Sequence, residues 1–176
     1  MKFAETQLVG VYIIDPERIA DERGFFGRTW CRDELASHDL ETDVSQCSLS
    51  FNLRRGTIRG MHFQMEPHAE TKIVRCTMGA IRDVVLDLRR ESPTFRQWVG
   101  VDLTVDNRRM VYVPRGCAHG FQTLLDATEV FYQITPSYMP EAARGVRWND
   151  PVFAIEWPVA DPILSARDRN YPDFVP

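Results

Sequence analysis

The chain has 176 residues and a mass of 20.3 kDa, which suits one domain with a buried core and is short for two. Hydrophobic residues make up 44% of the chain and charged residues 26%, which are ordinary proportions for a globular protein. The net charge of −4 disfavours a partner that is a nucleic acid, because proteins that bind such polymers are usually basic.

In chain order, the predicted elements are short strands separated by turns. Strands are predicted at residues 9–14, 25–30, 72–76, 80–88, 97–104, 109–113, 121–125 and 128–135. A short helix is predicted over residues 33–37, and the last two strands are predicted to form a hairpin around Asp126 and Ala127. This spacing predicts an all-β fold, either an antiparallel barrel or a double-sheet jelly roll, with few short helices.

From Ser137 onward the sequence becomes rich in proline and tryptophan, and this tail is predicted to wrap the barrel. Ser165 is a good N-cap for a final helical turn. No internal repeat, low-complexity segment or linker interrupts the chain. We therefore expect a single domain over residues 1–176.

The four cysteines are unevenly spaced, and none belongs to a Cys-x-x-Cys pair. This spacing disfavours a zinc knuckle or a redox pair and favours reduced thiols. No apolar run approaches the ~18 residues that a membrane span needs, and the first residues do not form a signal segment. A cytoplasmic location with no membrane partner is expected.

Cations are concentrated in residues 54–72, which contain three arginines, two histidines and a lysine. In a chain with a negative net charge, a local cluster of this kind favours a small phosphorylated ligand over a polymer. His62 belongs to the cluster, and a histidine can also transfer protons near neutral pH. The segment is therefore the first candidate for a functional site.

Residues 114–119, Pro-Arg-Gly-Cys-Ala-His, match the Pro-x-Gly-x-x-His element that is typical of the cupin superfamily. A metal-dependent cupin enzyme would use His62, Glu70 and His119 as ligands. Gln64 stands where such proteins often carry a second histidine, and a neutral amide is a poor ligand for a transition metal. We expect no metal, and keep the metal-dependent enzyme as an alternative.

Further motifs follow one another along the chain, at residues 21–26, 58–64, 72–75, 114–121, 144–151, 155–158 and 164–168. Together they resemble the dTDP-4-dehydrorhamnose 3,5-epimerase family over about residues 9–168. The resemblance implies a cupin-type jelly roll and a homodimer that exchanges N-terminal strands. It also implies no cofactor, and a nucleotide-diphosphate 4-keto-6-deoxy sugar as substrate.

Inverting a carbon next to a ketone requires a base on one face of the sugar, a group that stabilises the enolate, and an acid on the other face. The resemblance implies His62 as the base, Lys72 as the enolate-stabilising group and Tyr132 as the acid. It implies Asp168 as the carboxylate that orients His62. Asp83, on the face of its strand predicted to point inward, is an alternative partner for His62.

Six other residues are implied to contact the substrate. Guanidinium groups suit a diphosphate, and aromatic rings suit a nucleobase. The residues are Arg23 and Arg59 for the diphosphate, Phe26 and Tyr138 for the nucleobase, Gln46 for a polar contact, and His119 for the pocket floor or the positioning of substrate.

Three residues depart from the family pattern: Gln133 replaces a lysine, Ser48 an asparagine and Thr71 a glycine. The proposed catalytic set is unaffected, but two questions stay open. The nucleotide can be dTDP, CDP or GDP, and the reaction can invert C3, C5 or both. A non-catalytic sugar-nucleotide binder is a further alternative, although the retained proton-transfer groups favour an enzyme.

Overall fold

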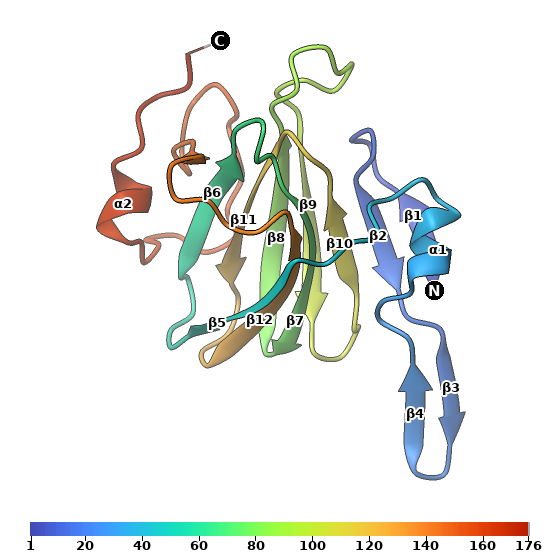
Figure 1. Ribbon diagram of the computed structural model, residues 1–176. Helices are drawn as coiled ribbons and strands as arrows, with labels where there is room; N and C mark the ends of the chain where they lie inside the picture. Colours follow the sequence, from blue (N-terminus) through green and yellow to red (C-terminus); the bar gives the residue numbers. More distant parts are fainter. Residues whose placement is uncertain (176) are drawn as a thin grey trace.

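The computed structural model describes residues 1–175 and consists mainly of antiparallel strands with two short helices (Figure 1). The elements are β1 (Lys2–Glu5), β2 (Tyr12–Asp15), β3 (Arg18–Asp21), β4 (Gly24–Gly27), α1 (Arg32–Ala36), β5 (Gln46–Asn52), β6 (Ile58–Gln64), β7 (Thr71–Met78), β8 (Ala80–Asp87), β9 (Trp98–Thr104), β10 (Met110–Val113), β11 (Cys117–Thr123), β12 (Thr128–Thr135), β13 (Ala143–Gly145) and α2 (Ala166–Arg169). Within the described residues, no helix is long and apolar enough to cross a membrane.

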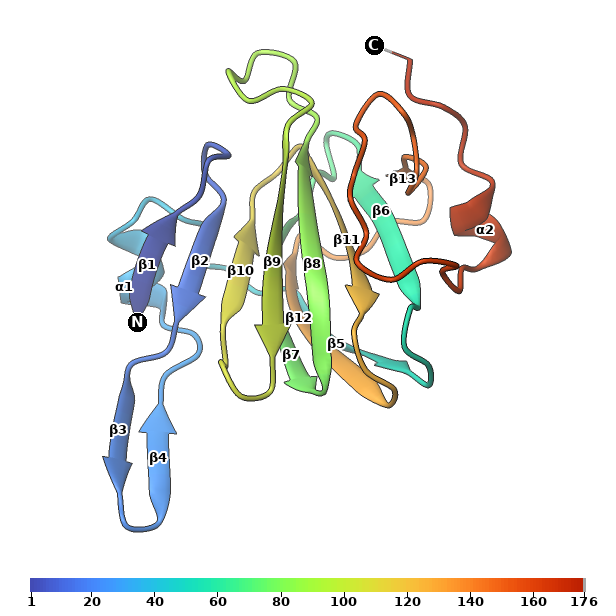
Figure 2. The same cartoon turned by 180° about the vertical axis from the view of Figure 1, so that it is seen from behind.

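Two sheets form the body of the molecule. One has the strand order β1-β2-β10-β7-β12-β5, and the other has the order β13-β6-β11-β8-β9. Strands β3 and β4 pair only with each other and form a hairpin that projects away from the body, as both ribbon views show (Figures 1 and 2). The two facing sheets confirm the predicted all-β, cupin-type jelly roll.

The core lies between the inner faces of the two sheets. Val74 and Val111 from the six-stranded sheet belong to the same buried cluster as Val85 and Phe121 from the five-stranded sheet. Val84, the neighbour of Val85, belongs instead to a second cluster on the outer face of β8. This alternation along β8 is the period of two that a strand has, and it places Asp83 on the inner face, as predicted.

The C-terminal tail covers the outer face of the five-stranded sheet. Val146, Phe153 and Ile155 of the tail pack in the same cluster as Met61 and Leu86 of the sheet. The tail then forms α2, and the Ser165 hydroxyl accepts a hydrogen bond from the Asp168 backbone N–H at 3.0 Å. The predicted N-cap is confirmed, and it fixes the backbone that carries Asp168.

The predicted hairpin of residues 121–125 and 128–135 is wrong. Strand β11 pairs with β6 and β8, whereas β12 pairs with β5 and β7 in the opposite sheet. The turn at Asp126 and Ala127 therefore carries the chain across the sandwich. A short turn of this kind resembles a hairpin turn in sequence, because its residue types reflect local backbone geometry and not which sheet comes next.

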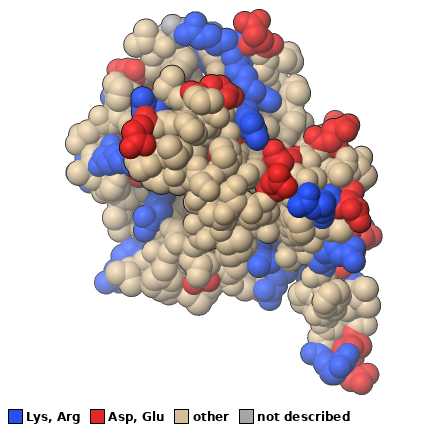
Figure 3. Space-filling model, viewed as in Figure 1, with Lys and Arg blue, Asp and Glu red and all other residues tan. Residues whose placement is uncertain are grey.

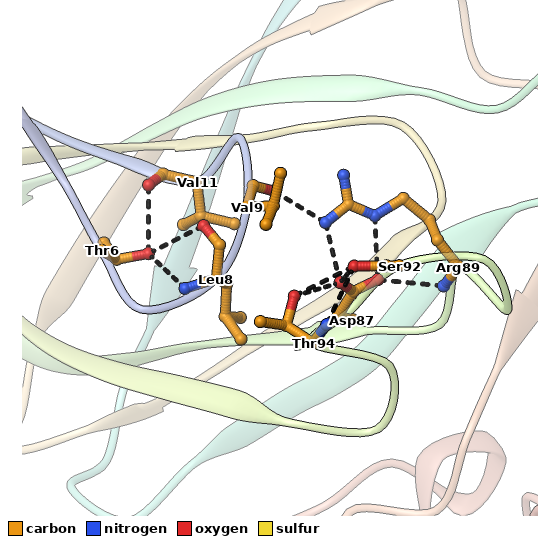
Figure 4. A network of polar contacts seen from close by, with 8 residues as sticks. All are labelled: Thr6, Leu8, Val9, Val11, Asp87, Arg89, Ser92 and Thr94. Carbon is orange, nitrogen blue, oxygen red and sulfur yellow. Dashed lines mark hydrogen bonds and ion pairs between the residues drawn. The ribbon is translucent and has the colours of Figure 1, made fainter.

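A buried polar network ties the loop after β8 to the loop before β2 (Figure 4). Both carboxylate oxygens of Asp87 accept hydrogen bonds from Arg89, at 2.8 Å each. Ser92 and Thr94 donate to the same carboxylate at 2.6 and 2.7 Å. Arg89 also donates to the backbone carbonyl of Val9 at 2.7 Å. The network thus connects two segments that are some eighty residues apart in the sequence.

Candidate active site

One pocket, with a volume of about 280 Å³, brings together residues from both sheets and from the tail. Its walls come from β5, β6, β7, β11, β12, β13 and α2. The lining residues are Ser48, Ser50, Arg59, His62, Phe63, Gln64, Glu70, Lys72, His119, Tyr132, Ile134, Tyr138, Ala143, Arg144 and Arg167.

His62 and Asp168 form a hydrogen-bonded pair at the wall of this pocket. His62 Nε2 lies 2.7 Å from Asp168 Oδ1, and the Asp168 side chain is almost fully buried. Burial alone would raise the pKa of Asp168, but the hydrogen bond and the charge of His62 hold it below its ordinary value. The carboxylate thus stays ionised beside the imidazole; the resemblance implies that it orients the ring, and this role stays a prediction.

A second pair, His119 with Asp83, lies on the neighbouring strands β11 and β8. His119 Nε2 lies 2.8 Å from Asp83 Oδ2, and both side chains are buried. In the register of β6 and β11, His119 is directly opposite His62. Asp83 is thus the partner of His119, which excludes the alternative that it pairs with His62.

Lys72 is a buried residue at the start of β7. Its Nζ atom forms an ion pair with Glu70 Oε1 at 2.8 Å, and both side chains are less than a tenth exposed. Water screens the charge of a lysine at the surface, whereas the charge of a buried ammonium that lines a cavity is less screened and acts more strongly on a ligand. Lys72 can therefore interact with negative charge inside the pocket.

Tyr132 lines the pocket from the inner face of β12. Its ring packs edge-on against His119, with 6.0 Å between the ring centroids. Burial raises the pKa of the Tyr132 phenol, and the nearby charge of Asp83 raises it further, against a smaller opposite effect of Arg59. The phenol is therefore protonated at neutral pH and can act only as a proton donor from its resting state.

The pocket is rich in cations. Arg59 lies on β6, and its Nε atom donates to Asn52 Oδ1 at 2.7 Å. Arg144 and Arg167 also line the cavity, and sequence analysis did not select either of them. The position of Arg167, directly before Asp168, was the signal that could have identified it. Three guanidinium groups suit a diphosphate.

The metal-binding alternative requires His62, Glu70 and His119 to converge on one point. Each of them pairs with a different side chain instead: Asp168, Lys72 and Asp83, respectively. Across residues 1–175, no group of three or more His, Cys, Asp or Glu side chains is arranged to hold a metal ion. The ligand set of the alternative is therefore not assembled.

The model of one protein family, described as dTDP-4-dehydrorhamnose 3,5-epimerase, matches residues 5–175. The chain belongs to this family. The match confirms the resemblance, and the protein is thus an isomerase, an epimerase of nucleotide-linked deoxy sugars.

Individual members of the family are similar over almost the whole chain. The dTDP-4-dehydrorhamnose 3,5-epimerase of Shigella flexneri is 39% identical, over 99% of this chain and 97% of its own. The Bacillus anthracis enzyme, solved with TDP and PPi bound, is 42% identical with a TM-score of 0.95, over 98% of this chain and 99% of its own. ChmJ, a 3'-monoepimerase from Streptomyces bikiniensis solved with dTDP-quinovose, is 29% identical with a TM-score of 0.89, over 96% of this chain and 85% of its own.

Three of the predicted substrate-binding residues do not line the pocket of their own chain. Arg23 and Phe26 lie on the projecting β3–β4 hairpin of this epimerase, where both are exposed. Gln46 uses its amide oxygen to accept a hydrogen bond from the Tyr138 backbone N–H at 2.9 Å. This contact holds Tyr138, whose ring lines the pocket, at the start of the tail.

Proposed function

We propose that the protein epimerises a dTDP-linked 4-keto-6-deoxy sugar at C3, C5 or both, without a cofactor. The observation that carries this proposal is the assembly of His62 with Asp168, Lys72 and Tyr132 around one cationic pocket. TDP in the Bacillus anthracis enzyme and dTDP-quinovose in ChmJ support dTDP as the nucleotide. The 3,5-epimerases and the 3'-monoepimerase among the relatives support either outcome at the two carbons.

His62 is the base in this proposal. Its Nε2 atom faces Asp168, so the Nδ1 atom is the nitrogen that can take a proton from the carbon next to the ketone. The buried carboxylate of Asp168 holds the ring in this tautomer and stabilises the imidazolium that forms. Both effects lower the barrier to proton removal.

The proton removed by His62 leaves an enolate whose oxygen carries negative charge. The Lys72 ammonium stabilises that charge, and its burial strengthens the interaction. Tyr132 then donates its proton to the carbon from the opposite face of the ring. Because a carbon that is reprotonated on the other face has the inverted configuration, the sequence of steps completes one epimerisation.

The substrate-binding roles of Arg23 and Phe26 require a second subunit. The β1 and β2 strands pair within their own sheet, so the segment available for exchange is the β3–β4 hairpin. We expect this hairpin to enter the pocket of the partner in a homodimer, where Arg23 binds the diphosphate and Phe26 stacks on the base.

The cytoplasmic location of the protein also stays a prediction. It is supported by the four cysteines, which are all unpaired thiols, as a cytoplasmic protein would have them.

The test is incorporation of deuterium from solvent into a panel of dTDP-, CDP- and GDP-linked 4-keto-6-deoxy sugars, followed by NMR. We expect exchange at C3, C5 or both, fastest with the dTDP sugar, together with an inverted product. Tight binding with no exchange would support a non-catalytic binder instead. Equal rates with all three nucleotides would contradict the assignment of dTDP.

A further inference from the structure

Glu70 is the one carboxylate among the residues that line the pocket. It lies two positions before Lys72, and in an extended chain residues two apart share a face. Both side chains therefore point into the same cavity and form the 2.8 Å ion pair. The proposed mechanism gives Lys72 a role but leaves Glu70 without one.

The loop that carries Glu70 is held in place by Gln64. The Gln64 amide donates to the backbone carbonyl of His68 at 3.1 Å and accepts from the backbone N–H of Met139 at 2.6 Å. Gln64 thus fastens the segment between β6 and β7 to the tail. A carboxylate on a fixed segment can recognise one particular substrate group, because its position does not adapt to other groups.

One oxygen of Glu70 is available to a ligand. Oε1 faces Lys72, whereas Oε2 accepts no hydrogen bond from any residue in the described part of the chain. Because Glu70 lines the cavity, we take Oε2 as the oxygen that a ligand in the cavity can contact. An ionised carboxylate oxygen in this position accepts hydrogen bonds and donates none.

The ion pair offers a donor and an acceptor side by side. In a 4-keto sugar, the ketone oxygen and the hydroxyl on C3 are neighbours, and they need a donor and an acceptor, respectively. If Lys72 donates to the ketone oxygen, Glu70 is placed to accept from this hydroxyl. On the other side of the ketone, C5 carries a methyl group, which offers a carboxylate nothing to bind.

We propose that Glu70 is a specificity-determining residue that accepts a hydrogen bond from the C3 hydroxyl of the 4-keto sugar. The inference rests on the proposed contact of Lys72 with the ketone. A sugar without that hydroxyl leaves a desolvated carboxylate oxygen unpaired, and the pocket disfavours it for this reason. The repulsion between Glu70 and phosphate also directs the diphosphate toward the arginines, at the other end of the ligand.

The experiment compares two dTDP-linked 4-keto-6-deoxy sugars, one with the C3 hydroxyl and one that lacks it. Both carry hydrogens on C3 and C5, the two carbons that flank the ketone, so deuterium exchange at these carbons reports on both sugars. We expect the wild-type protein to prefer the hydroxylated sugar by roughly 10- to 100-fold in kcat/KM. Glu70→Ala should lower kcat/KM for the hydroxylated sugar by a similar factor. For the sugar without the hydroxyl, kcat/KM should stay within about threefold of the wild-type value, so the preference disappears.

Three further variants complete the comparison. Glu70→Gln keeps an acceptor oxygen and should retain part of the preference, and it decides the outcome if Glu70→Ala does not fold. Lys72→Met should slow exchange with both sugars. Glu156→Ala, at an exposed glutamate of the tail, should change neither.

Two results would overturn the proposal. If the wild-type protein catalyses deuterium exchange equally well with both sugars, no residue of the pocket recognises the C3 hydroxyl. If Glu70→Ala and Glu70→Gln slow both sugars by the same factor, Glu70 acts only through Lys72. Absence of exchange with either sugar in the wild-type protein is a different result, which would overturn the epimerase activity itself and the inference with it.

Discussion

His62 offers the most direct test of the chemistry. We predict that His62→Asn lowers both kcat and solvent-deuterium exchange by about 10²- to 10⁴-fold, because removal of a general base usually has that effect. Asparagine keeps a polar side chain at the pocket wall, but its amide does not extend as far as Nε2, so the hydrogen bond to Asp168 is lost. Thermal unfolding is the control for folding of the variant. If the variant keeps more than a tenth of the wild-type rate, His62 is not the base.

Tyr132 tests whether two faces of the sugar are used. Tyr132→Phe keeps the ring that packs against His119 and removes only the hydroxyl. We predict that exchange continues, because His62 still removes the proton and can return a deuteron to the same face, while inversion falls by about 10²-fold or more. NMR gives exchange and product configuration in one sample. Near-normal inversion would show that another group, or water, donates the proton.

The resemblance to the family identified the main residues of the site and the pairing of His62 with Asp168, but not the pairing of His119 with Asp83. The resemblance identifies His62, Lys72, Tyr132 and Asp168; in the structure the first three line one pocket, and Asp168 is hydrogen-bonded to His62. That Asp83 pairs with His119 depends on the register of β8 against β11, which no local pattern encodes. The ion pair of Lys72 with Glu70 joins residues only two positions apart, so it depends on the local extended backbone and not on strand register.

Strand β5 shows why some elements escape sequence analysis. Its inward residues are polar, with Ser48 and Ser50 in the pocket wall, and its outward residues are apolar, with Leu49 and Phe51 exposed to 63% and 47%. This arrangement inverts the usual alternation of a half-buried strand. A strand that lines a polar pocket with one face and exposes apolar residues on the other gives no recognisable core pattern.

The Asp87 network should make stability depend on pH. Burial opposes ionisation of Asp87, but its bonds to Arg89, Ser92 and Thr94 outweigh burial and lower its pKa from 3.8 to about 2. A carboxyl with a lowered pKa stabilises the folded state above its unfolded pKa, and this contribution disappears as the pH falls through the folded pKa. The contribution is about 2 kcal/mol at neutral pH, and it is lost between about pH 4 and pH 2.

We therefore predict that Asp87→Asn lowers the free energy of unfolding by about 2 kcal/mol or more at pH 7. The difference from the wild-type protein should narrow as the pH falls below about 4, because the wild-type carboxyl then becomes protonated as well. Urea unfolding at several pH values measures this. Asp102→Asn, which breaks the more exposed pair with Arg82, is the control and should cost less than about 1 kcal/mol. A difference that stays constant with pH would contradict the assignment.

Seen whole, the single chain exposes apolar surface that a homodimer would cover. Ile19 and Phe26 on the hairpin are exposed to 72% and 71%, and the edge strand β5 has the exposed residues Leu49 and Phe51. The hairpin stands clear of the body in the space-filling view (Figure 3). An unpaired edge strand with apolar neighbours is a site where a second chain can add its own strands. These features support the predicted exchange between subunits.

The exchange of hairpins between subunits can be tested by mixing two defective variants of the protein. In the dimer that we propose, each pocket combines His62 of one subunit with Arg23 of the other. His62→Asn and Arg23→Ala homodimers are then both defective, the second mainly in KM, and assays at low substrate concentration reveal both defects. A mixed dimer has one pocket with both substitutions and one with neither.

Random reassociation of the two variants should therefore restore about a quarter of the wild-type activity, because half of the dimers are mixed and each has one intact pocket. The control is a mixture of His62→Asn with Lys72→Met, which both lie in the pocket of their own chain. Its mixed dimers have one defect in every pocket and should stay inactive. Recovery in the control, or no recovery with Arg23→Ala, would show that Arg23 does not serve the pocket of the partner subunit.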